Sequence, residues 1–140
     1  MGGYRKPLPV SDELSRAYWE GARRHQLVLQ QCPACGFYVH YPKPRCTRCG
    51  AEGLRPTAVS GRGIVHTFTM SHYVGAPGFE GEAPYAIVMV ELEEQPGLRI
   101  VANLRDCTAA DVKVGLPVEV VFEDVGPEVT LPQFRPRRTT

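Results

Sequence analysis

Two pairs of cysteines constrain this chain more than any other feature of its sequence. Cys32 and Cys35 form one Cys-x2-Cys-Gly motif, Cys46 and Cys49 form another, and ten residues separate Cys35 from Cys46. Sites of this form bind zinc, although the spacer here is shorter than in many of them. Each turn directs two sulfurs toward one point, and the glycine permits the backbone conformation after the second thiolate. The motif predicts a zinc ribbon.

Four thiolates complete the tetrahedral shell of zinc and leave no position for water, so we expect a structural rather than a catalytic ion. Iron in the same site, a redox disulfide or a coincidence of two cysteine pairs are the alternatives. Cys107 has no partner cysteine, and we expect a buried, inert thiol there. A nucleophilic Cys107 would need a base such as His66 or His72 within hydrogen-bonding distance, which the sequence does not establish.

The cellular setting follows from what the chain lacks. Its longest uninterrupted apolar run covers only residues 86–90, far below the roughly 20 residues of a membrane span. The N-terminal residues have no apolar stretch typical of a secretory signal. We therefore expect a cytoplasmic protein without a membrane segment, in which cysteines stay reduced or bind metal.

The charge balance bears on possible partners. Sixteen Lys and Arg against fifteen Asp and Glu give a formal charge of +1. Four thiolates with one divalent ion would shift that charge by two units, to −1. Proteins that grip nucleic acid usually carry a clear basic excess, so nucleic acid is not the expected partner.

An amphipathic helix is predicted over residues 12–25. Ser11 is the expected N-cap, and Asp12 and Glu13 place negative charge in the first turn. The members of its apolar face recur every three or four positions: Leu14, Tyr18, Ala22 and His25. Gly21 lies inside this pattern and costs about 1 kcal/mol relative to alanine. Packing rather than propensity should therefore hold the helix.

The second half of the chain reads as β-structure. Strands are predicted over residues 63–73, 84–93, 98–104, 118–123 and 129–134, enough for a small five-stranded barrel. In the first of them, strict alternation places five residues on one face: Ile64, His66, Phe68, Met70 and His72. Two histidines on an apolar face are expected to be packed or hydrogen-bonded rather than catalytic. We divide the chain into an N-terminal arm and helix (1–26), a zinc ribbon (27–56), a barrel (57–136) and a loose tail (137–140).

The chain resembles the acyl-CoA-associated zinc-ribbon and OB-fold proteins, a family long classed as a domain of unknown function. The resemblance covers residues 12–136 and follows the family order of motifs: 18–21, 27–29, 32–36, 42–46, 61–69, 83–92, 114–120 and 134–136. It implies a mainly β fold with an N-terminal helix, a rubredoxin-like zinc ribbon and a five-stranded OB-fold barrel.

The resemblance also implies a function. Family members are non-catalytic accessory subunits that bind a thiolase-fold enzyme and help to form its acyl-CoA site. That enzyme is a thiolase, an acyltransferase or a retro-aldolase, with the CoA thioester of a steroid side chain as one substrate, and some members pair with hydratases. Two copies of each subunit and a shared acyl-CoA are expected, but family membership does not identify the substrate.

The residues suggest where such a partner would bind. A helix beside a very small ribbon has little of its own chain against which to bury Tyr18 and Trp19, and aromatic rings beside Arg23 are typical of interface anchors. The alternative is that Trp19 covers the ribbon or the barrel.

Three further residues are candidates for contact with acyl-CoA. Phe79 is an apolar residue among glycines in a loop, where it would lie over a ligand or partner or simply be part of a bare loop. Arg105 and Arg135 suit the phosphates of CoA because the guanidinium group matches phosphate geometry. Solvated surface arginines are the alternative.

Two other function classes fit the sequence less well. A single-stranded nucleic-acid-binding OB-fold needs a basic groove with aromatic platforms, whereas the second and third barrel strands offer one ring, Tyr85, and an acidic end. An independent hydrolase or transferase would need a nucleophile with a base, and the sequence contains no nucleophile elbow or phosphate-binding loop.

Overall fold

The computed structural model describes residues 6–72, 77–78 and 81–137. Its elements are α1 (Arg16–Arg23), β1 (Leu27–Gln31), β2 (Tyr38–Val39), β3 (Arg55–Val59), β4 (Arg62–Ser71), β5 (Tyr85–Leu92), β6 (Arg99–Asn103), the short 3-10 helix η1 (Ala109–Asp111), β7 (Pro117–Asp124) and β8 (Thr130–Pro136). No helix among these residues is long and apolar enough to cross a membrane.

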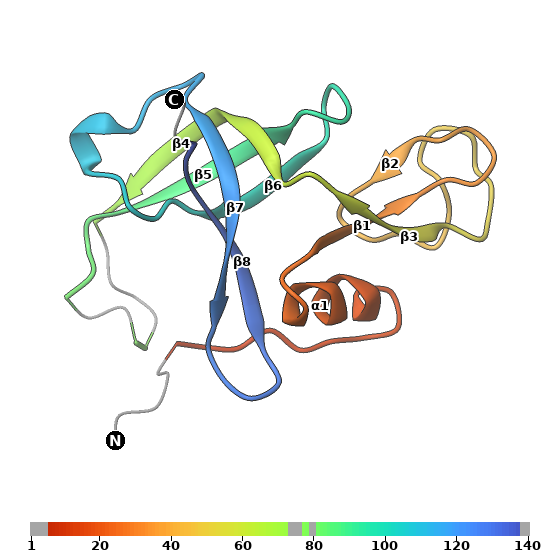
Figure 1. The fold of residues 1–140 in the computed structure, drawn as a ribbon, viewed down its shortest axis with the longest axis horizontal. Coiled ribbons are helices and arrows are strands. Elements are labelled where there is room, and N and C mark those ends of the chain that lie inside the picture. The colour runs from red at the N-terminus through yellow and green to blue at the C-terminus, as the bar shows by residue number, and fades with distance from the viewer. Residues whose placement is uncertain (1–5, 73–76, 79–80, 138–140) are drawn as a thin grey trace.

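The strands form two sheets, one for each half of the chain. The ribbon sheet has the order β2-β1-β3, and the larger sheet has the order β6-β5-β4-β7-β8. A parallel bridge between Leu104 and Phe134 brings β6 beside β8, and the Arg105 N–H donates to the Phe134 carbonyl at 2.7 Å. The five strands therefore close into a barrel of the OB type, and the mainly β fold predicted from the sequence is confirmed (Figure 1).

The barrel interior is the main core of the molecule. Its most deeply buried side chains include Val65 on β4, Val88 and Val90 on β5, Val118 on β7 and Phe134 on β8. Each of them is fully inaccessible to solvent. Leu27 and Leu29 of the ribbon belong to the same hydrophobic cluster. The strand β3 also crosses the boundary at 56/57 that we place between ribbon and barrel. The two halves are therefore joined by a continuous strand as well as by a common core.

A β-bulge corrects the predicted alternation in β4. The pairing of β4 with β5 shifts register between Val65 and Thr67, so one extra residue interrupts the two-residue period. Val65 is therefore completely buried, while Phe68 and Met70 also pack against the core. Ile64, predicted to share their face, is 45% exposed. A pattern of alternation cannot reveal the residue at which it resets.

The helix is shorter than predicted at both ends. It begins at Arg16, and its N-cap is Ser15 rather than Ser11. Asp12 instead closes the preceding turn, where its carboxylate accepts the Ser15 N–H at 2.8 Å and its own N–H donates to the Ser15 hydroxyl. The bond from Ser15 lowers the pKa of the Asp12 carboxyl.

A Schellman motif ends the helix before His25. The N–H groups of His25 and Gln26 donate to the carbonyls of Ala22 and Gly21, and His25 has a left-handed φ of 59°. His25 is thus exposed beyond the helix instead of lying on its apolar face. Its ring contacts Asp124 at 3.1 Å and stacks on Phe122, which links the helix end to the barrel.

Gly21 lies where the helix packs closely against the ribbon. A methyl group built on Gly21 would lie 2.5 Å from Cγ2 and 2.9 Å from Cβ of Val28 on β1. Gly21 and Ala22 are both buried. The glycine that weakens the helix is therefore what allows the helix to pack against β1.

We predict that Gly21→Ala destabilises the chain although alanine favours helix. The gain in propensity is about 1 kcal/mol, whereas overpacking against a β-branched side chain costs about 1–3 kcal/mol. Chemical denaturation should show a net loss of about 1 kcal/mol. Gly126→Ala is the matched control because no atom lies within 4 Å of its added methyl group. A more stable Gly21→Ala chain would contradict this packing.

Candidate metal centre and docking surface

The two cysteine motifs form two equivalent turns. The Gly36 N–H donates to the Cys32 carbonyl and the Gly50 N–H donates to the Cys46 carbonyl, each at 3.0 Å. Both glycines have a positive φ, 78° and 79°, which L side chains rarely adopt. The sequence repeat thus becomes a structural repeat, with one buried and one exposed cysteine in each turn.

The four sulfurs form one cluster between these two turns. All are within 4.8 Å of one another, and the Cys32–Cys49 and Cys35–Cys46 sulfur distances are 3.5 and 3.6 Å. Zinc–sulfur bonds of about 2.3 Å in a tetrahedron separate the sulfurs by about 3.8 Å. The donor set and its geometry therefore fit one zinc ion with a closed, structural shell.

Backbone N–H groups favour the thiolate form of the two buried cysteines. The Cys35 N–H donates to the Cys32 sulfur and lowers the pKa of that thiol. Burial opposes ionisation of Cys46, but the N–H groups of Cys49 and Arg48 outweigh it and lower the pKa of Cys46 to about 6. A metal ion binds the thiolate form of cysteine. By lowering the pKa of these thiols, the N–H groups of the two turns favour the form that binds a cation.

Polar contacts fix the ribbon to the barrel. The Tyr38 N–H donates to the Gln95 side chain at 2.8 Å, and the Gln95 amide donates back to the Tyr38 carbonyl at 3.0 Å. The Val101 N–H on β6 donates to the Tyr41 hydroxyl at 3.0 Å. The aromatic segment after the first cysteine turn therefore packs on the barrel in a defined position.

The predicted anchor residues differ in their surroundings. Tyr18 is mostly buried, stacks on His40 with ring centroids 5.3 Å apart, and packs against the barrel core. Its burial raises the pKa of its hydroxyl. Trp19 is half-buried, meets Tyr18 edge-on at 4.8 Å, and lines clefts against the N-terminal arm and β8, whereas Arg23 is exposed.

These positions correct one premise of the sequence analysis. We expected the helix to have little of its own chain against which to bury rings, but α1 lies in contact with β8 as well as with β1 and β3 (Figure 1). Tyr18 is consequently a packing residue of the free chain. Trp19 is still partly accessible, and Arg23 is exposed.

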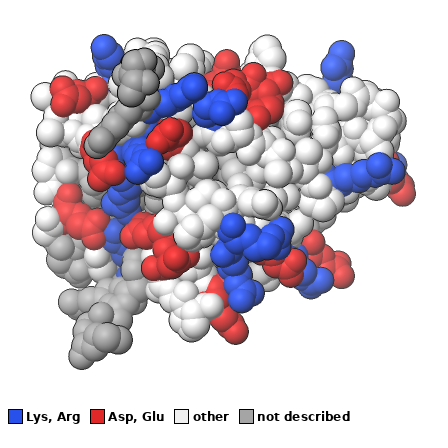
Figure 2. Space-filling view, viewed as in Figure 1, with Lys and Arg blue, Asp and Glu red and all other residues white. Residues whose placement is uncertain are grey.

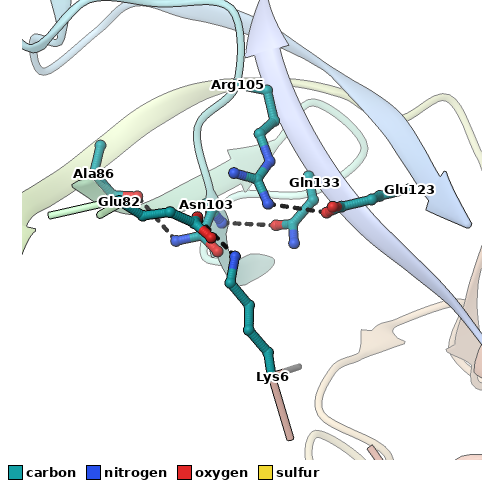
Figure 3. A network of polar contacts seen from close by, with 7 residues as sticks. All are labelled: Lys6, Glu82, Ala86, Asn103, Arg105, Glu123 and Gln133. Carbon is teal, nitrogen blue, oxygen red and sulfur yellow. Dashed lines mark hydrogen bonds and ion pairs between the residues drawn. The ribbon is translucent and has the colours of Figure 1, made fainter. Parts of the chain in front are cut away.

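The candidate acyl-CoA residues are not brought together as a ready anion site. Arg105 donates to Glu123 and Arg135 donates to Glu119, each at 2.9 Å. Figure 3 shows the Arg105–Glu123 pair together with a second ion pair, Lys6 with Glu82. Phe79 lies outside the described residues.

Arginines on the barrel surface are paired in the same way. Two further ion pairs, Arg62–Glu93 and Arg99–Glu91, join neighbouring strands. Figure 2 shows positive and negative side chains interspersed over the barrel instead of forming one basic groove on this face. This distribution disfavours the alternative of a nucleic-acid-binding OB-fold.

The remaining candidates offer no assembled catalytic group. The Cys107 thiol is partly buried and donates to the Thr108 carbonyl at 3.6 Å, and burial raises its pKa, which disfavours the nucleophilic thiolate. His66 and His72 are both exposed on or beside β4, so the packed state, one of the two that we expected, is wrong for both.

His40 was missed by the sequence analysis. Both of its ring nitrogens are buried and have no hydrogen-bond partner among the described residues. Burial lowers the pKa of His40 to about 4. Three aromatic residues within four positions, Tyr38, His40 and Tyr41, were the available signal for a packed segment here.

We predict that removing one metal ligand unfolds the ribbon. Cys32→Ala should lose the bound ion and the ribbon structure, because structural zinc contributes about 10–16 kcal/mol in small fingers. Cys107→Ser is the matched control and should keep one ion per chain. Elemental analysis with circular dichroism checks both, and a folded, metal-free wild-type chain would rule out the structural ion.

We also predict that His40 makes the chain sensitive to acid. The pKa of His40 is about 4 in the folded chain and 6.5 as its ordinary value, so the unfolded state binds the proton more readily. Stability is complete above about pH 6.5 and falls by up to about 3 kcal/mol as the pH approaches 4. His40→Phe should remove this part of the loss. Thiolate protonation affects both proteins equally, so equal acid sensitivity would contradict the prediction.

Comparisons with known proteins agree with the fold and the metal centre. Residues 19–55 match the rubredoxin-like zinc ribbon domain of ChsH2, and residues 56–123 match the C-terminal OB-fold domain of ChsH2. The zinc ribbon assignment and the four clustered sulfurs together establish a zinc site. The family membership predicted from the sequence motifs is confirmed.

Three proteins that are similar to this chain have informative names. A probable enoyl-CoA hydratase alpha subunit of Thermomonospora curvata is 34% identical over 94% of this chain, which spans only 40% of that protein. A DUF35 domain-containing scaffold protein of Methanocaldococcus jannaschii is 35% identical over 73% of this chain and 71% of its own length. The solved structure entitled Ltp2-ChsH2(DUF35) aldolase contains a chain that is 34% identical, with a TM-score of 0.82 over 91% of this chain and 98% of that one. The chain therefore belongs to the DUF35 family, with the zinc ribbon and OB-fold of ChsH2.

Proposed function

We propose that this chain is a non-catalytic accessory subunit that binds a thiolase-fold enzyme and helps to form its acyl-CoA site. The observation that carries the proposal is the match, over nearly the full length of both chains, to a chain of the Ltp2-ChsH2(DUF35) aldolase. The name of the Thermomonospora curvata relative likewise describes a subunit of an enzyme that acts on acyl-CoA.

The chemistry of the chain supports an accessory role. The four sulfurs fill the coordination shell of zinc, so the ion has no open position at which to activate water or polarise a thioester. Cys107 has a raised pKa, which suits a thiol that stays protonated. A catalytic centre is therefore expected on the partner.

The proposed partner surface centres on the outer side of α1. Trp19 and Arg23 are one helical turn apart and share a face, with Tyr18 packed behind Trp19. A half-buried aromatic ring held by a second ring, beside an exposed arginine, has the composition of an interface anchor. Two copies of each subunit are proposed, in keeping with the dimers that thiolase folds form.

The proposed acyl-CoA contacts are Phe79, Arg105 and Arg135. Because each arginine is already paired with a carboxylate, a phosphate would have to compete with Glu123 and Glu119. These contacts thus form only when the partner and coenzyme are both present. For the partner's reaction we propose retro-aldol cleavage, because the matching chain belongs to an aldolase. The CoA thioester of a steroid side chain is one proposed substrate. Thiolysis, condensation, acyl transfer and hydration are the competing reactions.

We predict that activity requires the partner and not Cys107. The isolated chain should turn over no acyl-CoA, whereas the complex co-expressed with the thiolase-fold protein encoded beside it should be stable and active. Cys107→Ser should leave that activity unchanged. Thioester cleavage by the isolated chain, lost in Cys107→Ser, would establish an independent enzyme instead.

We predict that Trp19→Ala weakens the complex by about 2 kcal/mol or more, since truncated anchors lose most of their interface energy. Titration calorimetry measures the loss, and unchanged circular dichroism and zinc content assign it to association. If the variant melts early while its folded fraction binds normally, Trp19 is a core residue and the docking surface lies elsewhere.

A further inference from the structure

A preformed uncharged groove lies between α1, the ribbon and the barrel. It has a volume of about 280 Å³, and Trp19, Tyr41, Val101, Leu131 and Pro132 contribute to its walls. No Asp, Glu, Lys or Arg is among the described residues that line it. His40 also lines it, and its ring is uncharged near neutral pH because burial lowers its pKa to about 4. This volume is at the lower limit of the roughly 300–1,000 Å³ of sites that enclose whole small molecules, and it is ample for one protein side chain.

Two large hydrophobic residues are unusually accessible in this groove. Tyr41 is 50% exposed and Val101 is 46% exposed. Tyr41 is nevertheless held in place, because its hydroxyl accepts the Val101 N–H at 3.0 Å. An exposed ring that is already fixed loses little conformational freedom on binding, which favours association.

Unpaired arginines border the groove on the helix side. Arg16 and Arg23 lie three residues before and four residues after Trp19, so they flank it on one helical face. Neither makes an ion pair with any described residue, although Glu20 is nearby on the exposed side of the helix. On the barrel, by contrast, Arg62 and Arg99 are each paired with a glutamate.

We infer that this groove, with its arginine border, is the docking site for an apolar side chain flanked by carboxylates on the surface of the partner enzyme. The uncharged walls take the apolar side chain, and Arg16 and Arg23 bind the carboxylates. Charge complementarity selects this occupant, since the arginines of α1 lack the partners that those of the barrel have within the chain. The inference rests on the proposed function and states which chemistry the partner presents.

The test uses two variants that spare the packing of the free chain. Val101→Asp places a charge in the groove through an exposed side chain, and Ile64→Asp is its control because Ile64 is equally exposed, at 45%, on β4 outside the groove. Arg16→Glu/Arg23→Glu reverses the border. Arg55→Glu/Lys113→Glu, at two exposed positions on the ribbon edge and on the barrel, controls for the same change of net charge.

Affinity for the co-expressed thiolase-fold protein would be measured at about 50 mM and about 300 mM salt, where screening differs strongly. Val101→Asp should weaken binding about tenfold or more at both salt concentrations. The arginine variant should weaken binding about tenfold at low salt and lose most of its salt dependence, because long-range attraction is removed. Both controls should bind within about twofold of wild type.

The possible failures are distinct. A wild-type chain that does not bind the thiolase-fold protein overturns the proposed function and the inference with it. A wild-type chain that binds, together with Val101→Asp and arginine variants that bind equally well, overturns the inference alone. Equal weakening by Ile64→Asp and Val101→Asp would also overturn it, since the effect would then not belong to the groove.

Discussion

Coordination of one ion by four cysteine thiolates is the interaction on which the rest of this molecule depends. The ribbon sheet has one five-residue strand on each side of its cysteine turns and a third strand of two residues, too little to form a core of its own. The ion joins both turns and thereby holds β1 in the position where Leu27 and Leu29 enter the barrel cluster. Barrel, ribbon and helix are consequently stabilised together rather than as separate units.

Function follows from what this arrangement leaves on the surface. The zinc shell is closed, the barrel arginines are neutralised by neighbouring glutamates, and Cys107 is held as a thiol. The described surface also has a fixed aromatic groove beside the arginines of α1. The proposed role as an accessory subunit rests on this groove and on the closed metal shell.

Much of the fold and the metal centre could be predicted because their signals are local. Cys32, Cys35, Cys46 and Cys49 identify their own site, since two adjacent turns are sufficient to bring the sulfurs together. The five barrel strands were also found in order. The bulge after Val65 and the start of α1 at Arg16 were not predicted. The pattern of hydrophobic residues does not specify the hydrogen bonds that set the strand register or the first turn of the helix.

The sequence by itself determined the closed zinc site, the mainly β fold and the family. The tertiary structure alone decided which aromatic rings are buried and which arginines are free. Tyr18 became a packing residue because β8, more than a hundred positions away, lies against α1. Arg105 and Arg135 became paired because β7 places Glu123 and Glu119 beside them. Such contacts depend on strand register and on how the helix packs against the barrel, and both bring together residues whose separation in sequence carries no local pattern.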